Sequence, residues 1–409
     1  MDMAKPKIRF KGYTDDWEQR KLDDVAEFSK GSGYSKGDLI EVGTPIILYG
    51  RLYTKYETSI SDVDTYVEAK EGSVYSKGGE VIVPASGETA EDIARAATVD
   101  KSGILLGGDL NVVMPSKDIN SAFMAISISN GNSQRELAKK AQGKSVVHIH
   151  NEEIRNLIVP FPNKVEQDKI VDYFTSLDHL ITLHQRKCEE TKKLKKYMLQ
   201  KMFPQNGQTV PEIRFAGFTD AWEQRKLNEI ADKVSEKNKN NEFSEPFTNS
   251  AEQGIISQKD YFDREIVNDE NLNGYYIVRN DDFIYNPRIS VTAPVGPINR
   301  NRLGRNGVIS PLYTVFRTHD IDNLYLEFYF KTTKWHRFMK LNGDSGARFD
   351  RFTISSTQFM EMPIPYPTLE EQRKIGAYFE SLATLITLHQ HKCEQLQNMK
   401  KFMLQNMFV

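Results

Sequence analysis

The strongest constraint on this chain is that its sequence is written twice. The run "YTDDWEQRKL" at Tyr13–Leu22 returns as "FTDAWEQRKL" at Phe218–Leu227, 205 residues further along. The longer run "EQDKIVDYFTSLDHLITLHQRKCE" at Glu166–Glu189 returns at Glu371–Glu394 with the same offset. The two half-chains share their ends, while their interiors differ. A period of this length indicates two duplicated domains and excludes a solenoid of short repeats.

The composition is that of a globular protein with room for two cores. The chain has 409 residues, of which 39% are hydrophobic and 27% charged, which suffices for two domains of ordinary size. No apolar run approaches the roughly 20 residues that cross a bilayer, and the N-terminus lacks the apolar core of a signal peptide. We therefore expect a cytoplasmic protein without membrane contact. The net charge is −2, so a nucleic-acid binder would have to concentrate its positive charge locally.

Each half-chain divides into a mixed region and a long helix. Short β-branched runs bounded by Gly or Pro, such as "GGEVIVPAS" and "DLNVVMP", predict strands. The run "NLYLEFYFKTTKWHRFMKL" (Asn323–Leu341) predicts one amphipathic helix, matched in the first half by "SAFMAISISNGNSQRELAKKA", and Pro160 and Pro162 are expected to end regular structure. The predicted fold is α+β, with two pseudo-symmetric α/β domains and a pair of long helices. The predicted segments are a first domain at 1–163, a helix at 164–203, a linker "PQNGQTVPE" at 204–212, a second domain at 213–368 and a second helix at 369–409.

Both long helices carry apolar residues at alternating steps of four and three, the seam of a coiled coil. At about 1.5 Å per residue each helix would span roughly 55–60 Å, which suits a spacer. The alternative is that each seam packs only on its own domain. The residues expected to pair the helices are Ile170, Phe174, Leu177, Ile181, His184 and Cys188 in the first copy, and Ile375, Phe379, Leu382, Ile386, His389 and Cys393 in the second.

Two H-x-x-x-C pairs lie on these seams, His184 with Cys188 and His389 with Cys393. Two His and two Cys can hold tetrahedral zinc if antiparallel helices bring them together. They also fit as modest-sized seam residues at a crossing point. We expect no metal site. Two cysteines at equivalent positions do not suggest a disulfide framework.

Catalytic signatures are absent from the sequence. "AKKAQGKS" (Ala138–Ser145) has alanine where a P-loop needs its first glycine. "NPRI" (Asn286–Ile289) is similar to the Asn-Pro-Pro-Tyr loop of amino-group DNA methyltransferases, but Arg288 replaces the second proline and Ile289 the aromatic residue. We expect that the chain catalyses nothing by itself.

Candidate DNA-binding residues come from charge patterning. No Asp or Glu occurs from Phe283 to His319, whereas five arginines do, and "INRNRLGR" (Ile298–Arg305) predicts a basic loop able to contact phosphates and base edges. A solvated loop is the alternative. In the first half the candidates are an aromatic and basic cluster, which could equally be a strand edge, and a hydroxyl- and carboxylate-bearing loop that aligns with the Arg288 region. The candidates are Tyr49, Arg51, Tyr53, Lys55, Ser86, Glu88, Thr89, Asn286, Arg288, Ser290, Arg300, Asn301, Arg302, Arg305, Arg348 and Arg351.

The repeated "WEQRKL", the closing P-x-P and the helix "LITLHQ-x-KCE" resemble the specificity subunit of type I restriction–modification enzymes, over essentially the whole chain. The resemblance implies that each variable region reads one half of a bipartite double-stranded DNA target. It also implies that antiparallel helices fix the spacing and dock two methyltransferase subunits, with two restriction/translocase subunits in the full complex. S-adenosylmethionine, ATP and Mg²⁺ would belong to those partners, and the complex would be a DNA adenine methyltransferase and ATP-dependent endonuclease. The alternatives are a single-chain DNA-modifying enzyme and a coiled-coil adaptor.

Overall fold

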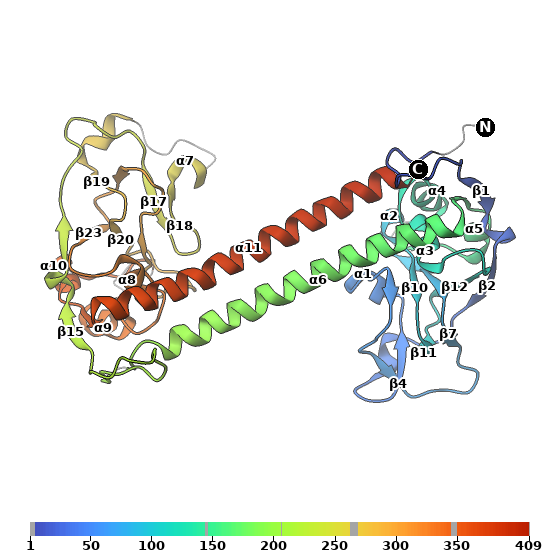
Figure 1. Cartoon of the computed structure of the whole chain (residues 1–409), viewed down its shortest axis with the longest axis horizontal. Coiled ribbons are helices and arrows are strands. Elements are labelled where there is room, and N and C mark those ends of the chain that lie inside the picture. Colours follow the sequence, from blue (N-terminus) through green and yellow to red (C-terminus); the bar gives the residue numbers. More distant parts are fainter. Residues whose placement is uncertain (1–4, 144–145, 206, 262–268, 345–349, 409) are drawn as a thin grey trace. The chain divides into compact units, whose positions relative to one another are not determined.

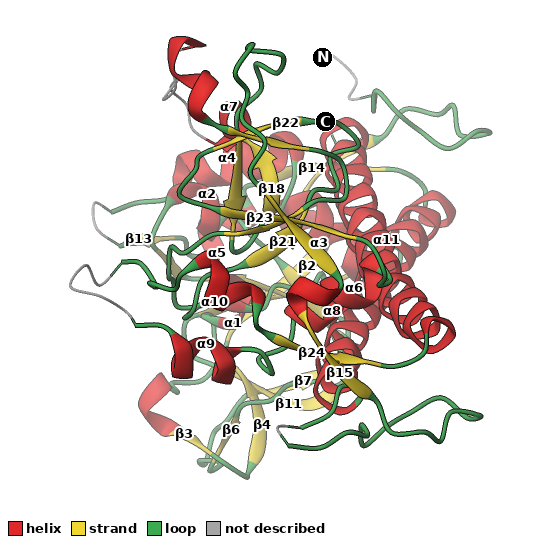
Figure 2. Cartoon of the chain, turned by 90° about the vertical axis from the view of Figure 1, so that its left-hand side faces the viewer, coloured by secondary structure: helices red, strands yellow, loops and turns green. Residues whose placement is uncertain are grey.

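A computed structural model describes residues 5–143, 146–205, 207–261, 269–344 and 350–408. The chain forms two compact units. Unit 1 comprises Met1–Gln185 with His391–Val409, and unit 2 comprises Arg186–Gln390. Each unit holds one domain of short strands and helices together with one end of each of two long helices (Figure 1). Both domains contain short helices as well as strands (Figure 2).

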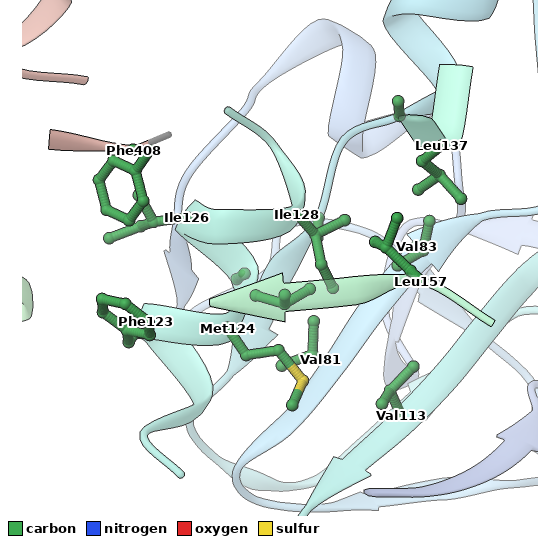
Figure 3. Close-up of a cluster of buried hydrophobic side chains, with 14 of the residues drawn as sticks. Val81, Val83, Val113, Phe123, Met124, Ile126, Ile128, Leu137, Leu157 and Phe408 are labelled. Atoms are coloured by element: carbon green, nitrogen blue, oxygen red, sulfur yellow. The ribbon is translucent and has the colours of Figure 1, made fainter. Parts of the chain in front are cut away.

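The core of unit 1 is built on the strand β8 (Glu80–Pro84), whose residues are all buried. It lies between β12 (Leu110–Pro115) and β10 (Ala97–Val99), pairing antiparallel with both. A continuous apolar run such as "VIVP" (Val81–Pro84) is typical of a strand covered on both faces. Val81 and Val83 of β8 pack with Met124 and Ile128 of the helix α3 (Ser121–Ile128) (Figure 3).

The described part of unit 1 contains two five-stranded sheets, β2-β12-β8-β10-β5 and β3-β6-β4-β11-β7, and the pairs β1-β14 and β9-β13. The remaining elements of this domain are β1 (Glu18–Lys21), β2 (Ala26–Lys30), β3 (Leu39–Ile40), β4 (Thr44–Ile47), α1 (Arg51–Thr54), β5 (Ser59–Ile60), β6 (Tyr66–Val67), β7 (Tyr75–Lys77), β9 (Ser86–Gly87), α2 (Ala90–Ile93), β11 (Ser102–Leu106), α4 (Gly131–Lys140), β13 (Val147–His148), α5 (Asn151–Arg155) and β14 (Ile158–Phe161).

Within the described residues of unit 2, a four-stranded sheet β16-β23-β20-β21 is accompanied by the pairs β17-β18, β19-β22 and β15-β24. The elements are β15 (Glu223–Lys226), β16 (Ala231–Val234), β17 (Phe247–Ser250), β18 (Gly254–Ser257), α7 (Gln258–Tyr261), β19 (Tyr276–Val278), β20 (Phe283–Tyr285), β21 (Ile298–Arg300), β22 (Gly307–Ile309), β23 (Thr314–Thr318), α8 (Asn323–Phe330), α9 (His336–Asn342), α10 (Ser356–Met360) and β24 (Pro363–Tyr366).

Within each half-chain, the repeated opening segment pairs with the repeated closing segment. Strand β1 pairs antiparallel with β14, and β15 pairs with β24 in the equivalent way. The closing P-x-P segments are therefore strands, and the expectation that Pro160 ends regular structure was wrong. Proline is tolerated here because each of these sheets has two strands in the described residues, and so consists of edges only.

The single helix predicted over Asn323–Leu341 was also wrong. The chain forms α8 and α9 with a break between them, at which the Thr332 hydroxyl donates to the Tyr329 carbonyl at 2.7 Å and accepts from the Lys334 amide at 3.2 Å. Threonine side chains that bond the nearby backbone compete with continued helix. In unit 1 the matching segment breaks at Gly131, which has φ +64 and begins α4.

Two long helices follow the domains, α6 (Lys164–Lys201) and α11 (Leu369–Met407). Each begins at a side chain that caps a free backbone amide. The Glu166 amide donates to Asn163 Oδ1 at 3.0 Å, and the Glu371 amide donates to Thr368 Oγ1 at 3.3 Å. Asn and Thr are favoured caps because they satisfy donors that the first helical turn leaves open.

In unit 1 the first half of α6 packs against the last turns of α11. Ile170, Phe174, Leu177 and Ile181 are buried in one cluster with Leu396, Met407 and Phe408, with Cys393 packed at its edge. The rings of Phe174 and Phe408 lie 6.0 Å apart, and Asp178 pairs with Lys400 at 2.5 Å. The partner numbers fall as those in α6 rise, so the two segments run antiparallel.

In unit 2 the last turns of α6 pack against the first half of α11. Ile375, Phe379 and Leu382 are buried with Met202 and Phe203, and Met198 and Leu199 pack at the edge of the cluster. The rings of Phe203 and Phe379 stack at 6.0 Å, and Cys188 Sγ lies 4.0 Å from the Ile386 carbonyl. These segments are antiparallel too. The seam residues His184 and His389 are half-buried.

Candidate nucleic-acid interface

In the second domain, the backbone segments around Arg288 and Arg351 run antiparallel, and these two residues lie opposite each other in an isolated β-bridge. We call this pair of segments the arginine crossing. The bridge is held by hydrogen bonds on both sides, from the Ile289 amide to the Asp350 carbonyl at 3.0 Å and from the Phe352 amide to the Pro287 carbonyl at 2.8 Å. Opposed residues between such bonds form a non-hydrogen-bonded pair, whose side chains leave on the same face and lie close. The fold thus places two arginines side by side.

Among the described residues, no acidic side chain neutralises this arginine pair. Both residues are exposed, and within the described residues neither guanidinium has a carboxylate within 4.0 Å. Like charges directly opposite each other in a sheet destabilise it. An exposed pair of this kind is suited to an anion such as phosphate, or to the acceptor atoms of a guanine edge.

The other candidate arginines that the structure describes in this domain, Arg300, Arg302 and Arg305, are bound to carboxylates. Arg300 pairs with Asp281 at 3.0 Å and Glu327 at 2.8 Å, and Arg305 pairs with Glu245 at 2.7 Å. Arg302 donates to both oxygens of Glu380, at 2.7 and 2.9 Å. The hydrogen bond from Arg302 is the main cause that lowers the pKa of Glu380.

The prediction of a basic loop at Ile298–Arg305 needs correction. The segment begins as the strand β21, because Phe283 to Tyr285 pair with it. Asn301 is fully buried, and its amide donates to the carbonyls of Arg279 and Arg305, each at 3.0 Å. Its side chain is therefore used inside the protein.

Asn286 shapes the segment that carries Arg288. It is buried, its amide donates to the Asn249 carbonyl at 2.8 Å, and its Oδ1 accepts from the Arg288 amide at 2.9 Å. Ser290 follows in an exposed turn, where its Oγ accepts from the Ala293 amide at 3.1 Å. Arg348 lies outside the described residues.

The first domain carries the equivalent crossing with different side chains. Strands β9 and β13 pair antiparallel so that Ser86 lies opposite His148. Ser86 Oγ lies 3.1 Å from His148 Nδ1, and the rings of His148 and His150 are parallel with centroids 6.4 Å apart. Ser86 and Arg288, which the sequence alignment pairs, thus each oppose a residue of the segment that precedes α5 or α10. Sequence reasoning missed the histidines, although "HIH" on a strand puts both on one face.

The aromatic and basic cluster of the first domain forms the short helix α1, not a strand edge. Arg51 is buried and pairs with Glu57 at 2.7 Å and Asp64 at 2.9 Å, and Lys55 pairs with Asp64 at 3.2 Å. Tyr53 joins this helix to the crossing, since its hydroxyl donates to the Ser86 carbonyl at 2.8 Å.

The remaining candidates of this domain lie around the same crossing. Burial raises the pKa of Tyr53, so its hydroxyl stays protonated. Tyr49 packs edge-on against it at 6.2 Å. Glu88 is exposed, while Thr89 caps α2 by accepting from the Asp92 amide at 3.1 Å.

Among the residues that the structure describes, there is neither a cluster of metal ligands nor a helix that could cross a membrane. In that part of the chain, no three His, Cys, Asp or Glu side chains come together as metal ligands. No described helix combines the length and apolar character needed to cross a bilayer.

Comparison with known proteins identifies the family. The family model for the type I restriction modification DNA specificity domain matches residues 14–193 and again 219–398. The two matches are offset by the same 205 residues as the repeat and cover most of the chain. The protein therefore belongs to the family of type I restriction–modification DNA specificity proteins. It is a DNA target-recognition subunit with two specificity domains, and as a specificity subunit it is non-catalytic.

Individual relatives extend over nearly the whole chain. The MjaX specificity subunit of a type I restriction enzyme, from Methanocaldococcus jannaschii, is 26% identical and covers 95% of this chain and 91% of its own. The MjaVIII specificity subunit of the same organism is 22% identical with the same coverage. The crystal structure of a type I S subunit from M. genitalium has the same fold, with a TM-score of 0.57, 15% identity and 99% coverage of both chains.

Proposed function

We propose that each domain reads one half of a bipartite double-stranded DNA sequence through the crossing described above. The first domain would use the surface around Ser86 and His148, and the second the surface around Arg288 and Arg351. The observation that supports this most is the exposed arginine pair, whose mutual repulsion has no compensation among the described residues. The two crossings share a backbone arrangement but differ in chemistry, as two readers of different bases require.

The test is methylome sequencing of a host that carries this chain with its methyltransferase partner. We expect one methylated motif with two specified halves and an unread gap. Replacing Asp23–Asn163 with the corresponding region of a relative should change one half and leave the other intact. If both halves changed, or if the motif had no gap, the assignment of one reader to each domain would fail.

The long helices are proposed to dock two copies of a methyltransferase subunit. Leu194 and Tyr197 on α6 are 44% and 51% exposed, and Met399 and Phe402, at the repeat-equivalent positions of α11, are 48% and 55% exposed. Residues three apart share a helix face. An apolar pair left open at both copies of the repeat favours two copies of one partner. S-adenosylmethionine, ATP and Mg²⁺, methyl transfer and DNA cleavage are assigned to the partner subunits, including two restriction/translocase subunits.

Native mass spectrometry of the complex checks the docking proposal. We expect Leu194→Ser with Tyr197→Ser to leave one bound methyltransferase instead of two, and Met399→Ser with Phe402→Ser to do the same. Combining all four should leave none. Leu341→Ser, at a residue of α9 that is 74% exposed, is the matched control and should keep both copies.

A further inference from the structure

A tight turn projects from the arginine crossing of the second domain. It spans Ser290 to Ala293, whose amides and carbonyls bond each other at 3.0 and 3.2 Å. Ser290 Oγ also lies 3.2 Å from Thr292 Oγ1, on the other side of Val291. Gly296 closes the loop with φ +85, where an added Cβ would lie 2.1 Å from the Asn286 carbonyl oxygen. The turn is therefore fixed on the same backbone that carries Arg288.

Val291 stands at the tip of this turn with a relative exposure of 102%, the highest among the exposed large hydrophobic residues of the described chain. A single exposed apolar residue is ordinary on a protein surface and by itself indicates nothing. This valine, however, lies three residues from Arg288, on a turn held by side-chain and backbone hydrogen bonds. Its β-branched side chain has a restricted choice of χ1 rotamers, so few side-chain conformations are lost when it contacts a ligand.

We propose that Val291 reads the C5 methyl group of a thymine in the major groove of the second half-site. Among the bases, only thymine presents a methyl group there, and apolar side chains are its natural contacts. Arg288 and Arg351 would hold the DNA beside the turn through its anionic or acceptor atoms. The inference rests on the proposed function and deepens it, because it assigns a chemical preference to one residue.

The test uses the full chain with its methyltransferase partner and duplexes that carry the motif found by methylome sequencing. Each thymine of the second half-site is replaced in turn by deoxyuridine, which removes only the methyl group. Wild-type protein should bind one of these duplexes about fourfold more weakly, the equivalent of one buried methyl group. Val291→Ala should bind the parent duplex more weakly and lose its sensitivity to deoxyuridine at that position.

Val42→Ala is the matched control, since Val42 of the first domain is 85% exposed. It should keep the wild-type response to deoxyuridine in the second half-site. The proposal is overturned if every deoxyuridine duplex binds wild-type protein as tightly as the parent. It is also overturned if Val291→Ala stays sensitive, or if the second half-site contains no thymine on either strand. Failure of the proposed function would look different, because no bipartite methylated motif would then exist.

Discussion

Arg9 donates two hydrogen bonds to the fully buried carboxylate of Glu166, at 2.6 and 2.7 Å. The pair recurs 205 residues later, where Arg214 donates to Glu371 at 2.7 and 2.9 Å. In each copy an arginine of the entry segment is joined to the first turn of a long helix. The "IRF" at Ile8–Phe10 and Ile213–Phe215 and the "EQ" that opens each long helix are therefore the two sides of one contact, which fixes the start of the helix to its domain.

Removing either arginine should destabilise its unit strongly. Arg9→Ala leaves Glu166 buried without a partner, which typically costs about 3–5 kcal/mol. Arg214→Ala should cost less, because the Glu371 carboxylate keeps the hydrogen bond that the Trp222 indole N–H donates at 3.1 Å. Urea unfolding measures the loss. Lys164→Ala is the control, since its pair with Asp168 is exposed and should contribute less than about 1 kcal/mol. Equal small effects from all three variants would contradict this account.

The arginine crossing should lower the stability of its domain and strengthen its binding to DNA. Arg351→Gln relieves the repulsion with Arg288, so we expect the free energy of unfolding to rise by about 0.2–1 kcal/mol while DNA binding weakens. Binding at several salt concentrations then separates two cases. A lost phosphate contact lowers the salt slope by about 1, whereas a lost base contact costs about 1–3 kcal/mol and relaxes one motif position.

Arg337→Gln provides the comparison for that variant, because Arg337 is an exposed arginine of α9 in the same domain. This substitution removes one positive charge without changing the arginine crossing. The free energy of unfolding of the variant and its methylated DNA motif should therefore stay as in the wild type. A loss of DNA binding equal to that of Arg351→Gln would assign the effect to general charge.

The ion pair between Arg302 and Glu380 predicts a pH-dependent stability. Its hydrogen bonds lower the pKa of Glu380 in the folded state, so the contribution is present above the usual glutamate pKa and disappears as the pH falls through the lowered value. Because both side chains are more than a third exposed, we expect no more than about 1 kcal/mol. Thermal unfolding of wild type and Glu380→Gln should differ at pH 7 and converge under acid conditions. A constant difference would exclude this pair as the cause.

The helices are expected to measure the gap between the half-sites. Because Cys188 lies level with Ile386, seven residues inserted after each position keep the seam in register. The insertion adds about 10 Å, so methylome sequencing should find a gap about three base pairs longer with both half-site sequences unchanged. The same insertion in α6 alone should abolish methylation, because the seams no longer match. An unchanged gap in the double variant would show that another part of the complex sets the distance.

The repeat and the heptad seam could be predicted because both are visible in the order of the residues alone. The 205-residue offset gave the two domains, and the steps of four and three gave the long helices, since an apolar stripe at that period must be covered by a partner. The sequence could not place the break in the segment Asn323–Leu341. There, hydroxyl-to-backbone bonds at Thr332 compete with a pattern that otherwise favours helix.

The sequence by itself determined the family, the duplication and the residue types available for DNA contact. Only the tertiary structure decided which of those residues are open to a ligand. Arg288, Arg302 and Arg305 look alike along the chain, yet Arg302 and Arg305 meet Glu380 and Glu245 from distant segments, while Arg288 meets another arginine. A charge is neutralised when folding brings an opposite charge within a few ångströms of it. The energy of such a pair depends on the distance between the two charges in space and not on their separation along the sequence.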